Sequence, residues 1–232
     1  MIIDFLPIPG ALAGFTTRVP GTPPESYAGN LGYHVGDDPK NVDRWRAELQ
    51  ERTGPLAWMS QVHGTTILDA QPHVQEADGL LVRPGQGAAV MVADCVPLLL
   101  IGRSNNDPVI GAVVHVGRAG LLGGIGVRGV EALRVKGAEQ IEAIIGPAIC
   151  GQCYEVGEAM AEDSEKVMPG SSCVTRWGTA GIDIPGALAE QLRSNGVEVC
   201  DERVCTMEDD RYFSHRRQKG QAGRFAGVLV LP

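Results

Sequence analysis

The segment Val109-Ile110-Gly111-Ala112-Val113-Val114-His115 is a short, β-branched apolar run that ends in a histidine just before a glycine turn. Its length and its valine content predict a buried β-strand. Similar runs predict further buried strands at residues 88–93, 143–149 and 225–231. Continuous apolar strands of this kind are typical of sheets that are covered on both faces.

Helix signals lie between the strands. A carboxylate cap before a proline predicts a helix that starts at Asp38-Pro39, and a second helix starts in the same way at Asp183-Ile184-Pro185 and ends near Gly196. Apolar residues at helical spacing mark their inward faces: Val42, Trp45 and Leu49, then Leu188 and Leu192. Because helices and strands alternate without strict βαβ order, we expect an α/β fold in which one domain, residues 1–232, has a mixed β-sheet layered with helices on both faces.

Composition and charge exclude several classes of function. Twenty basic and 28 acidic residues give a formal net charge of −8, which disfavours a phosphate-tracking surface for nucleic acid. No apolar run is long enough to span a bilayer, so we expect no membrane partner. The segment Met1–Pro7 has an acid and a proline where a signal peptide has lysines and leucines, which predicts a cytoplasmic protein. In that reducing compartment the six cysteines are expected to be thiols or metal ligands.

Three metal-competent side chains each end an apolar run just before a turn: His63, Cys95 and His115. Taken singly, each is most often a satisfied histidine or a small buried thiol. Together, two imidazoles and a thiolate match a catalytic zinc site that keeps a fourth position open for water or substrate. We therefore predict that neighbouring strands bring the three together, with Pro97 ending regular pairing beside Cys95.

Other motifs leave alternatives open. Cys150-x2-Cys153 with Cys200-x4-Cys205 could form a second, structural zinc site, although free thiols near strand ends are the favoured interpretation. Gly124–Gly129 matches GxGxxG, but the motif does not directly follow a strand, so we interpret it as a glycine-rich helix start. The arginines of the stretch 205–217 either hold a phosphate or belong to a solvated turn.

With these motifs in order along nearly the whole chain, the sequence resembles the YfiH family, also called the laccase-domain or multicopper polyphenol oxidase family. The resemblance lies in segments such as Phe15–Arg18, Asn30–Gly32, His34–Pro39, Gln61–Thr65, Ala77–Gly79, Ala93–Pro97, Gly146–Ile149, Tyr154–Gly157, Phe213–Arg217 and Gly223–Arg224. It implies an α/β fold like that of the toxin-type cysteine hydrolases.

The resemblance also implies a site and an activity. The zinc ligands of the family fall on His63, Cys95 and His115. The implied activity is phosphorolysis of adenosine, inosine and methylthioadenosine with adenosine deamination, which makes a purine nucleoside and phosphate the partners and suggests a homodimer. Candidate catalytic and substrate-binding residues are then Cys95, Asp94 and His115, and Gln61, Arg118, Arg216 and Arg217.

Zn²⁺ is expected rather than copper. A multicopper oxidase needs a histidine-rich trinuclear cluster, whereas this chain has five histidines and no His-x-His pair. One departure from the family bears on substrate preference, because its HAGWRG motif is here His115-Val116-Gly117-Arg118-Ala119-Gly120. The usual tryptophan is Arg118 and the usual arginine is Ala119.

Two alternatives use the same residues differently. In the first, Cys95 is a nucleophile and His115 its base, and the protein cleaves an amide or a peptidoglycan precursor. In the second, suggested by the change at Arg118-Ala119, the chain is a regulatory module that binds a nucleoside without turnover.

Overall fold

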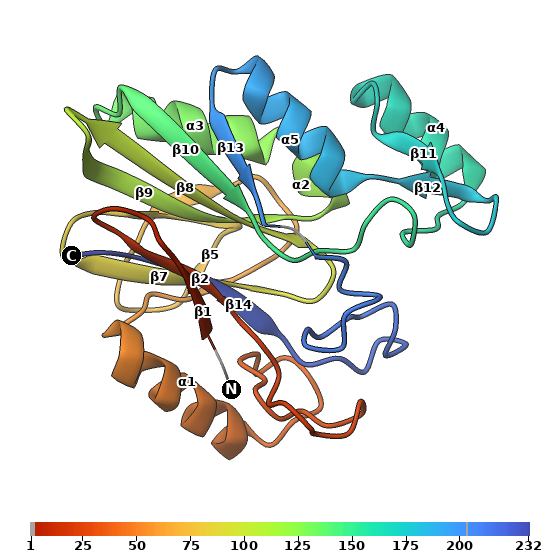
Figure 1. The fold of residues 1–232 in the computed structure, drawn as a ribbon, viewed down its shortest axis with the longest axis horizontal. Coiled ribbons are helices and arrows are strands. Elements are labelled where there is room, and N and C mark those ends of the chain that lie inside the picture. The colour runs from red at the N-terminus through yellow and green to blue at the C-terminus, as the bar shows by residue number, and fades with distance from the viewer. Residues whose placement is uncertain (1–2, 203) are drawn as a thin grey trace.

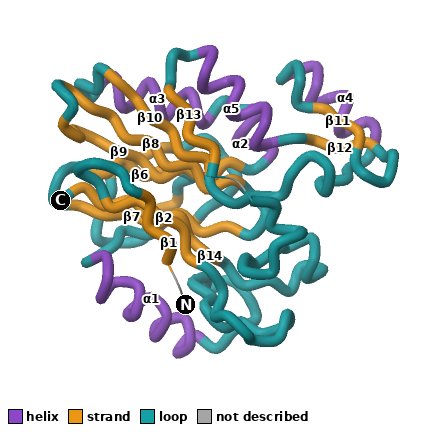
Figure 2. The backbone as a smooth tube through the Cα atoms, viewed as in Figure 1, coloured by secondary structure: helices purple, strands orange, loops and turns teal. Residues whose placement is uncertain are grey.

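The computed structural model describes residues 3–202 and 204–232, so Met1 and Ile2 of the N-terminal segment lie outside the described residues. Its helices are drawn in Figure 1 and coloured purple in Figure 2: α1 (Pro39–Thr53), α2 (Arg118–Leu122), α3 (Ile125–Val135), α4 (Glu158–Val167) and α5 (Ile184–Ser194). Among the described residues, no helix is long and apolar enough to cross a membrane.

The strands form two main sheets. A four-stranded antiparallel sheet has the order β1-β2-β14-β7, formed by β1 (Ile3–Leu6), β2 (Leu12–Thr16), β14 (Phe225–Leu231) and β7 (Gln86–Val92). A six-stranded mixed sheet has the order β13-β10-β8-β9-β6-β4, formed by β13 (Glu198–Asp201), β10 (Gln140–Ile145), β8 (Val96–Ser104), β9 (Asp107–Val116), β6 (Gly79–Val82) and β4 (Ile67–Asp69). Two small sheets pair β3 (Met59–Ser60) with β5 (Gln75–Glu76), and β11 (Ser172–Val174) with β12 (Ala180–Ile182).

The two main sheets pack face to face, and helices cover their outer faces (Figure 1). Because alternate residues of a strand point to opposite faces, Leu99 and Ile101 of β8 pack toward the four-stranded sheet. Leu98 and Leu100 pack on the other side, against α3 and α5. On the far side of the four-stranded sheet, Leu49 of α1 joins the outer core. The result is four layers, helix, sheet, sheet and helix.

Both predicted helix starts are confirmed. The Asp38 side chain caps α1 by accepting a hydrogen bond from the backbone N–H of Lys40, and Asp183 caps α5 in the same way from Gly186. Gly124–Gly129 is also a helix start, since α3 begins at Ile125. A Cβ at Gly126 or Gly129 would lie 2.7 Å from a leucine methyl of α5 or β8, so these glycines permit close helix packing.

The strand predictions are confirmed, and three expectations need correction. The predicted α/β class holds, but the expected mixed sheet is divided into two sheets, each with helices on one face only. The strand that was predicted at residues 143–149 ends at Ile145, because the chain turns at Gly146-Pro147. The prediction that Pro97 ends pairing is wrong. Pro97 pairs with His115 inside β8, just beyond the end of the β10 ladder at Leu98, where no neighbouring strand needs its missing N–H.

Candidate metal centre and substrate cavity

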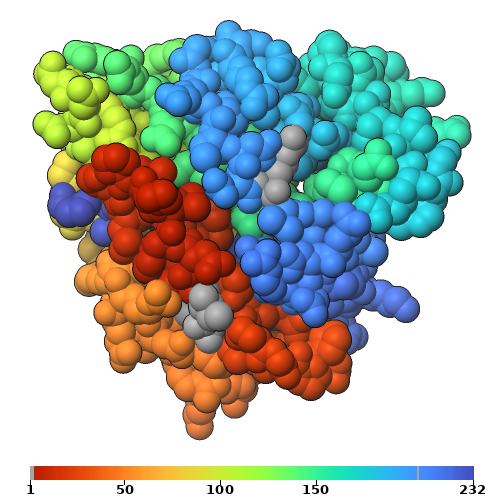
Figure 3. All heavy atoms as spheres, in the orientation of Figure 1, coloured from red at the N-terminus to blue at the C-terminus, as the bar shows by residue number. Residues whose placement is uncertain are grey.

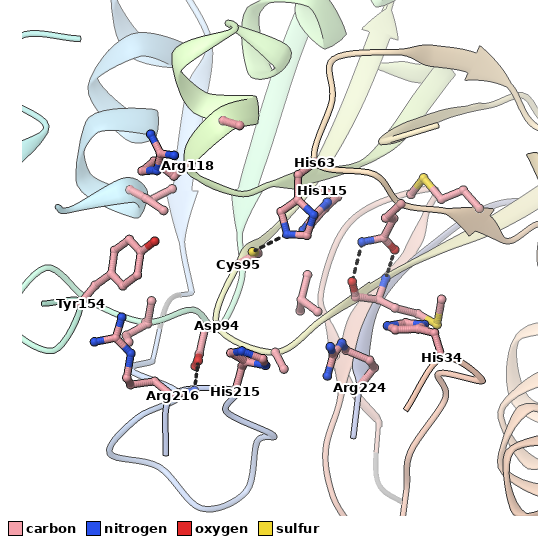
Figure 4. Close-up of a pocket in the computed structure, with 18 of the residues that line it drawn as sticks. His34, His63, Asp94, Cys95, His115, Arg118, Tyr154, His215, Arg216 and Arg224 are labelled. Carbon is pink, nitrogen blue, oxygen red and sulfur yellow. Dashed lines mark hydrogen bonds between the residues drawn. The ribbon is translucent and has the colours of Figure 1, made fainter. Parts of the chain in front are cut away.

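The three predicted ligands meet at one end of the two-sheet sandwich (Figure 4). His115 is the second-to-last residue of β9 and shares the face of Val113, which points toward the four-stranded sheet. Cys95 lies in the turn that passes from β7 in one sheet to β8 in the other. His63 lies in the loop that follows β3. The crossover between sheets therefore brings the thiol beside both imidazoles.

The ligand atoms of this trio lie within 4.8 Å of one another. The sulfur of Cys95 is 3.8 Å from Nε2 of His63. The two imidazole rings meet edge to face, with centroids 4.6 Å apart and planes at 78°. His115 is buried, Cys95 is half-buried and His63 is exposed, so the cluster opens to solvent on the His63 side.

The carboxylate of Asp78 positions two of the three ligands, His63 and His115, through hydrogen bonds. Its carboxylate is completely buried and accepts a 2.8 Å hydrogen bond from Nδ1 of His115. The same carboxylate accepts the backbone N–H groups of Val62, His63 and Gly64 at 3.3, 3.0 and 2.7 Å. With Nδ1 engaged in this way, His115 presents Nε2 to the cluster.

The protonation states of Cys95 and His115 depend on each other. Burial raises the pKa of Cys95, but the neighbouring His115 and hydrogen bonds from both histidines outweigh burial and lower it to about 6. Burial lowers the pKa of His115, but the Cys95 thiolate and Asp78 outweigh burial and raise it to about 9. Without a metal ion, the site at neutral pH is therefore a thiolate–imidazolium pair.

Two backbone conformations beside the cluster are unusual. His63 and Asp94 have positive φ values of 60° and 86°, which non-glycine residues rarely adopt. At Asp94 the surroundings fix the conformation, since its carboxylate accepts hydrogen bonds from the Thr206 hydroxyl at 2.6 Å and from the Arg216 backbone N–H at 2.7 Å. Strained residues of this kind cluster at functional sites, where other contacts offset their cost.

A cavity of about 740 Å³ opens over the cluster. Arg118 and Tyr154 lie on one side of it and His34 and Arg224 on the other (Figure 4). Apolar side chains, among them Ile149, complete the wall. The size is typical of a site for a small organic ligand, and the guanidinium groups favour an anion.

The structure brings most of the predicted substrate-binding residues to this cavity. Arg118 and Arg216 line it, and the Arg216 guanidinium lies 5.3 Å from the centre of the Tyr154 ring. Gln61 also lines the cavity, but its amide pairs with the backbone of Met91 through bonds of 2.7 and 2.9 Å, as a strand would.

The structure places Arg217 differently. It is not among the residues that line the cavity. Its guanidinium donates to the carbonyl oxygens of Thr206, Asp209 and Tyr212 and so ties the chain segment before it together. These contacts account for Arg217 structurally, and a role in substrate binding stays a prediction.

Sequence reasoning missed other residues of the site. Asp78, His34 and Arg224 belonged to the motifs of the family resemblance, but no function was predicted for them, and Tyr154 was missed in the same way. For Asp78 the one signal was an acid between Ala77 and Gly79 just before an apolar run, a pattern that is also common in turns.

The trio fits a tetrahedral metal ion. Two imidazole nitrogens and a thiolate around zinc would lie about 3.5 Å apart, so the trio needs a contraction of no more than roughly 1 Å. Because the cluster is open toward the cavity, a bound ion would have its fourth position free for a small ligand.

Residues 12–232 match the model of a protein family described as multi-copper polyphenol oxidoreductase laccase. The chain belongs to this family, the YfiH or laccase-domain family. A relative from Corynebacterium glutamicum, named a purine nucleoside phosphorylase, is 42% identical over 94% of this chain and 93% of its own length. A Mycobacterium tuberculosis protein of the same name is 42% identical over 93% of this chain and 90% of its own.

Solved structures of YfiH-family proteins share the fold. A Neisseria meningitidis protein superposes with a TM-score of 0.85 at 31% identity, over 99% of this chain and 98% of its own. YlmD from Geobacillus stearothermophilus gives a TM-score of 0.83 at 30% identity, over 97% of this chain and 93% of its own.

The departure from the YfiH-family motif falls at the cavity wall. Both Arg118 and Ala119 line the cavity, and Arg118 is the first residue of α2. The chain thus presents a guanidinium from the position at which the family usually has tryptophan.

Proposed function

We propose that this protein is a zinc-dependent purine nucleoside phosphorylase that also deaminates adenosine. The observation that carries the proposal is the His63–Cys95–His115 cluster, which faces a cavity rimmed by guanidinium groups. Relatives that are 42% identical over most of the chain are named purine nucleoside phosphorylases, which supports the same activity. Zinc is favoured over copper because two imidazoles and one thiolate match a catalytic zinc site.

When bound, zinc supplies a Lewis acid that polarises an oxygen in its open position. The protein's own residues position the reactants. Arg118 and Arg216 hold the phosphate dianion at the cavity wall, and the Tyr154 ring packs against the purine. Asp78 keeps Nδ1 of His115 engaged and so fixes the direction of Nε2.

Two reactions are proposed at this one site. In phosphorolysis, a phosphate oxygen forms a bond to the sugar C1′ as the glycosidic bond breaks, which gives a free base and ribose 1-phosphate. In deamination, water attacks C6 of adenosine, and inosine and ammonia result. Methylthioadenosine is also a substrate of the first reaction, which gives adenine and 5-methylthioribose 1-phosphate.

The deciding assay incubates the zinc-loaded protein with adenosine, inosine or methylthioadenosine, with and without phosphate, and separates the products by chromatography. We expect free base only when phosphate is present, and inosine from adenosine in both cases. Cys95→Ala should lose the zinc of this cluster and both activities, whereas the control Cys200→Ala, on β13 and outside the cluster, should keep them. Zinc-loaded protein that yields neither base nor inosine contradicts the proposal, and nucleoside binding without turnover would indicate a regulatory binding module.

One observation favours a second function. The Cys95 thiolate beside His115, which Asp78 orients, has the components of a cysteine–histidine–aspartate hydrolase site. Such an enzyme would cleave an amide or a peptidoglycan precursor and would need the thiol free of metal. Metal-free protein that hydrolyses such a substrate and is inactivated by alkylation of Cys95 supports this function, whereas stoichiometric zinc on Cys95 in the active protein argues against it.

A cytoplasmic location and a homodimer belong to the same proposal. All six cysteines are unpaired in the structure, and a reducing compartment keeps thiols in that state. Light scattering of the purified protein measures the oligomeric state directly.

A further inference from the structure

Two chain segments outside the His63–Cys95–His115 cluster meet beside the six-stranded sheet. Strands β10 and β13 are parallel neighbours, so the chain leaves both at the same end of the sheet (Figure 1). Beyond them, Ala148 and Cys205 form a parallel bridge. The Ala148 N–H donates to the Val204 carbonyl, and the Thr206 N–H donates to the Ala148 carbonyl, both at 3.1 Å.

This bridge gathers three thiols and a carboxylate: Cys150, Cys153, Cys205 and Glu208. Their ligand atoms lie within 4.8 Å of one another. We propose that this cluster is a second metal site, which binds a structural Zn²⁺ through three thiolates and the Glu208 carboxylate. Four such donors around zinc are tetrahedral, with sulfurs about 3.8 Å apart, so the site would close with a contraction of no more than roughly 1 Å.

The two arms of the site have the same local design. Each has two ligands separated by two residues, Cys150-x2-Cys153 and Cys205-x2-Glu208. In the first arm the Cys150 carbonyl accepts the N–H groups of Cys153 and Tyr154 at 3.0 and 2.9 Å. In the second arm the Cys205 carbonyl accepts those of Glu208 and Asp209 at 3.0 and 2.9 Å. The two turns have the same local hydrogen bonds, and the ligand atoms of both arms lie within 4.8 Å of one another.

The surroundings suit a bound cation. The Cys150 N–H lies 3.5 Å from the Cys205 sulfur, in position to donate to a thiolate. A bound cation would hold the thiols deprotonated. Arg176 pairs with one oxygen of Glu208 at 2.8 Å and leaves the other oxygen for the metal.

The second site is connected to the cavity wall. Tyr154, which follows Cys153, lines the cavity, and Thr206, which follows Cys205, donates its hydroxyl to Asp94. The N–H of Ile149, which precedes Cys150, donates to the Asp94 carbonyl at 2.9 Å. An ion that clamps the two arms would therefore fix the strained turn of Asp94 beside Cys95.

Zinc content per chain, measured by mass spectrometry of the dialysed protein, tests the proposal independently of any activity. Wild type should hold two zinc ions, Cys150→Ser/Cys153→Ser should hold one, and Cys95→Ser should hold one. The combined variant should hold none. Cys200→Ser, on β13 and outside both clusters, should still hold two. Glu208→Gln should release its second zinc to a chelator at least tenfold faster than wild type.

A thiol-protection measurement keeps the test valid if the double variant fails to fold. In zinc-loaded wild type, Cys150 and Cys205 should resist alkylation until a chelator is added, whereas Cys200 should react equally in both states. A wild-type protein with one zinc, all of it lost in Cys95→Ser, would overturn the proposal. Alkylation of Cys150 and Cys205 at the same rate with and without zinc would do the same, as would a disulfide between them in zinc-loaded protein.

Discussion

Asp78 shows how much a single buried carboxylate can organise. It accepts four hydrogen bonds, three from the loop that carries His63 and one from His115. A neutral amide cannot accept all four, because its NH₂ group would face an N–H group. Asp78 therefore links the conformation of the loop that carries His63 to the orientation of the His115 ring.

We predict that Asp78→Asn weakens zinc binding by about 10–100-fold and lowers the free energy of unfolding by about 2–4 kcal/mol. Chelator competition and urea unfolding measure the two effects. Hydrogen bonds from His115 and the loop hold the pKa of Asp78 below its usual value although burial opposes them, so its contribution to stability is present above about pH 4 and is lost as the pH falls. Wild-type zinc affinity in the variant would contradict this role.

Zinc affinity should also depend on pH in a defined direction. With the pKa of Cys95 near 6 and that of His115 near 9, the metal-free site between pH 7 and 8.5 holds a thiolate and an imidazolium. Binding must then displace the proton of His115, so the affinity should rise about tenfold for each pH unit in this window. Calorimetry in buffers of different ionisation enthalpy counts the released protons. An affinity that stays constant from pH 7 to 8.5 would show that the imidazolium is absent.

At the scale of elements, the crossing of the chain between the two sheets decides the site. Strand β7 ends in the four-stranded sheet and β8 begins in the six-stranded sheet, so the turn between them, which holds Asp94 and Cys95, spans the end of the sandwich. The spacing of the two sheets near this end depends on close packing of Phe15 from β2 against Gly146, which follows β10.

Gly146→Ala should separate these elements. An added Cβ would lie 2.2 Å from a ring carbon of Phe15, so the ring has to move. We expect a loss of about 1–3 kcal/mol of stability and a melting temperature that is lower by roughly 2–12 °C. The matched control is Gly157→Ala, where a Cβ meets nothing within 4 Å. Equal melting temperatures for the two variants would show that Phe15 is not constrained there.

At the scale of the whole molecule, the candidate metal centre joins distant parts of the chain. His63 comes from a loop after β3, Cys95 from the crossover between the sheets, and His115 from the middle of the six-stranded sheet. An ion bound to all three links both sheets, and it binds the folded state alone because the unfolded chain does not assemble the trio.

Zinc should therefore raise the melting temperature. Free zinc at 100 times its dissociation constant stabilises the folded state by about 2.7 kcal/mol, which corresponds to roughly 5–11 °C for a chain of this size. Calorimetric melting of protein with and without a chelator measures the shift. Cys95→Ser should lose the part of the shift that belongs to this centre, and a variant that keeps the full shift would place the stabilising ion elsewhere.

The sequence by itself determined the local features of this protein. Apolar runs and carboxylate caps predicted the strands around residues 88–93, 109–115 and 225–231 and the starts of α1 and α5, because these signals act over a few neighbouring residues. The three candidate ligands were likewise found from residue type and position at the ends of apolar runs.

Only the tertiary structure decided how these parts meet. The division into two sheets, the buried support from Asp78 and the meeting of Cys150 with Cys205 all depend on contacts between residues that are tens of positions apart. Strand pairing across a crossover leaves no periodic trace in the sequence, because each partner is an ordinary residue in its own segment. For that reason Cys200 was a plausible ligand in the sequence, whereas the fold places Glu208, and not Cys200, beside Cys150, Cys153 and Cys205.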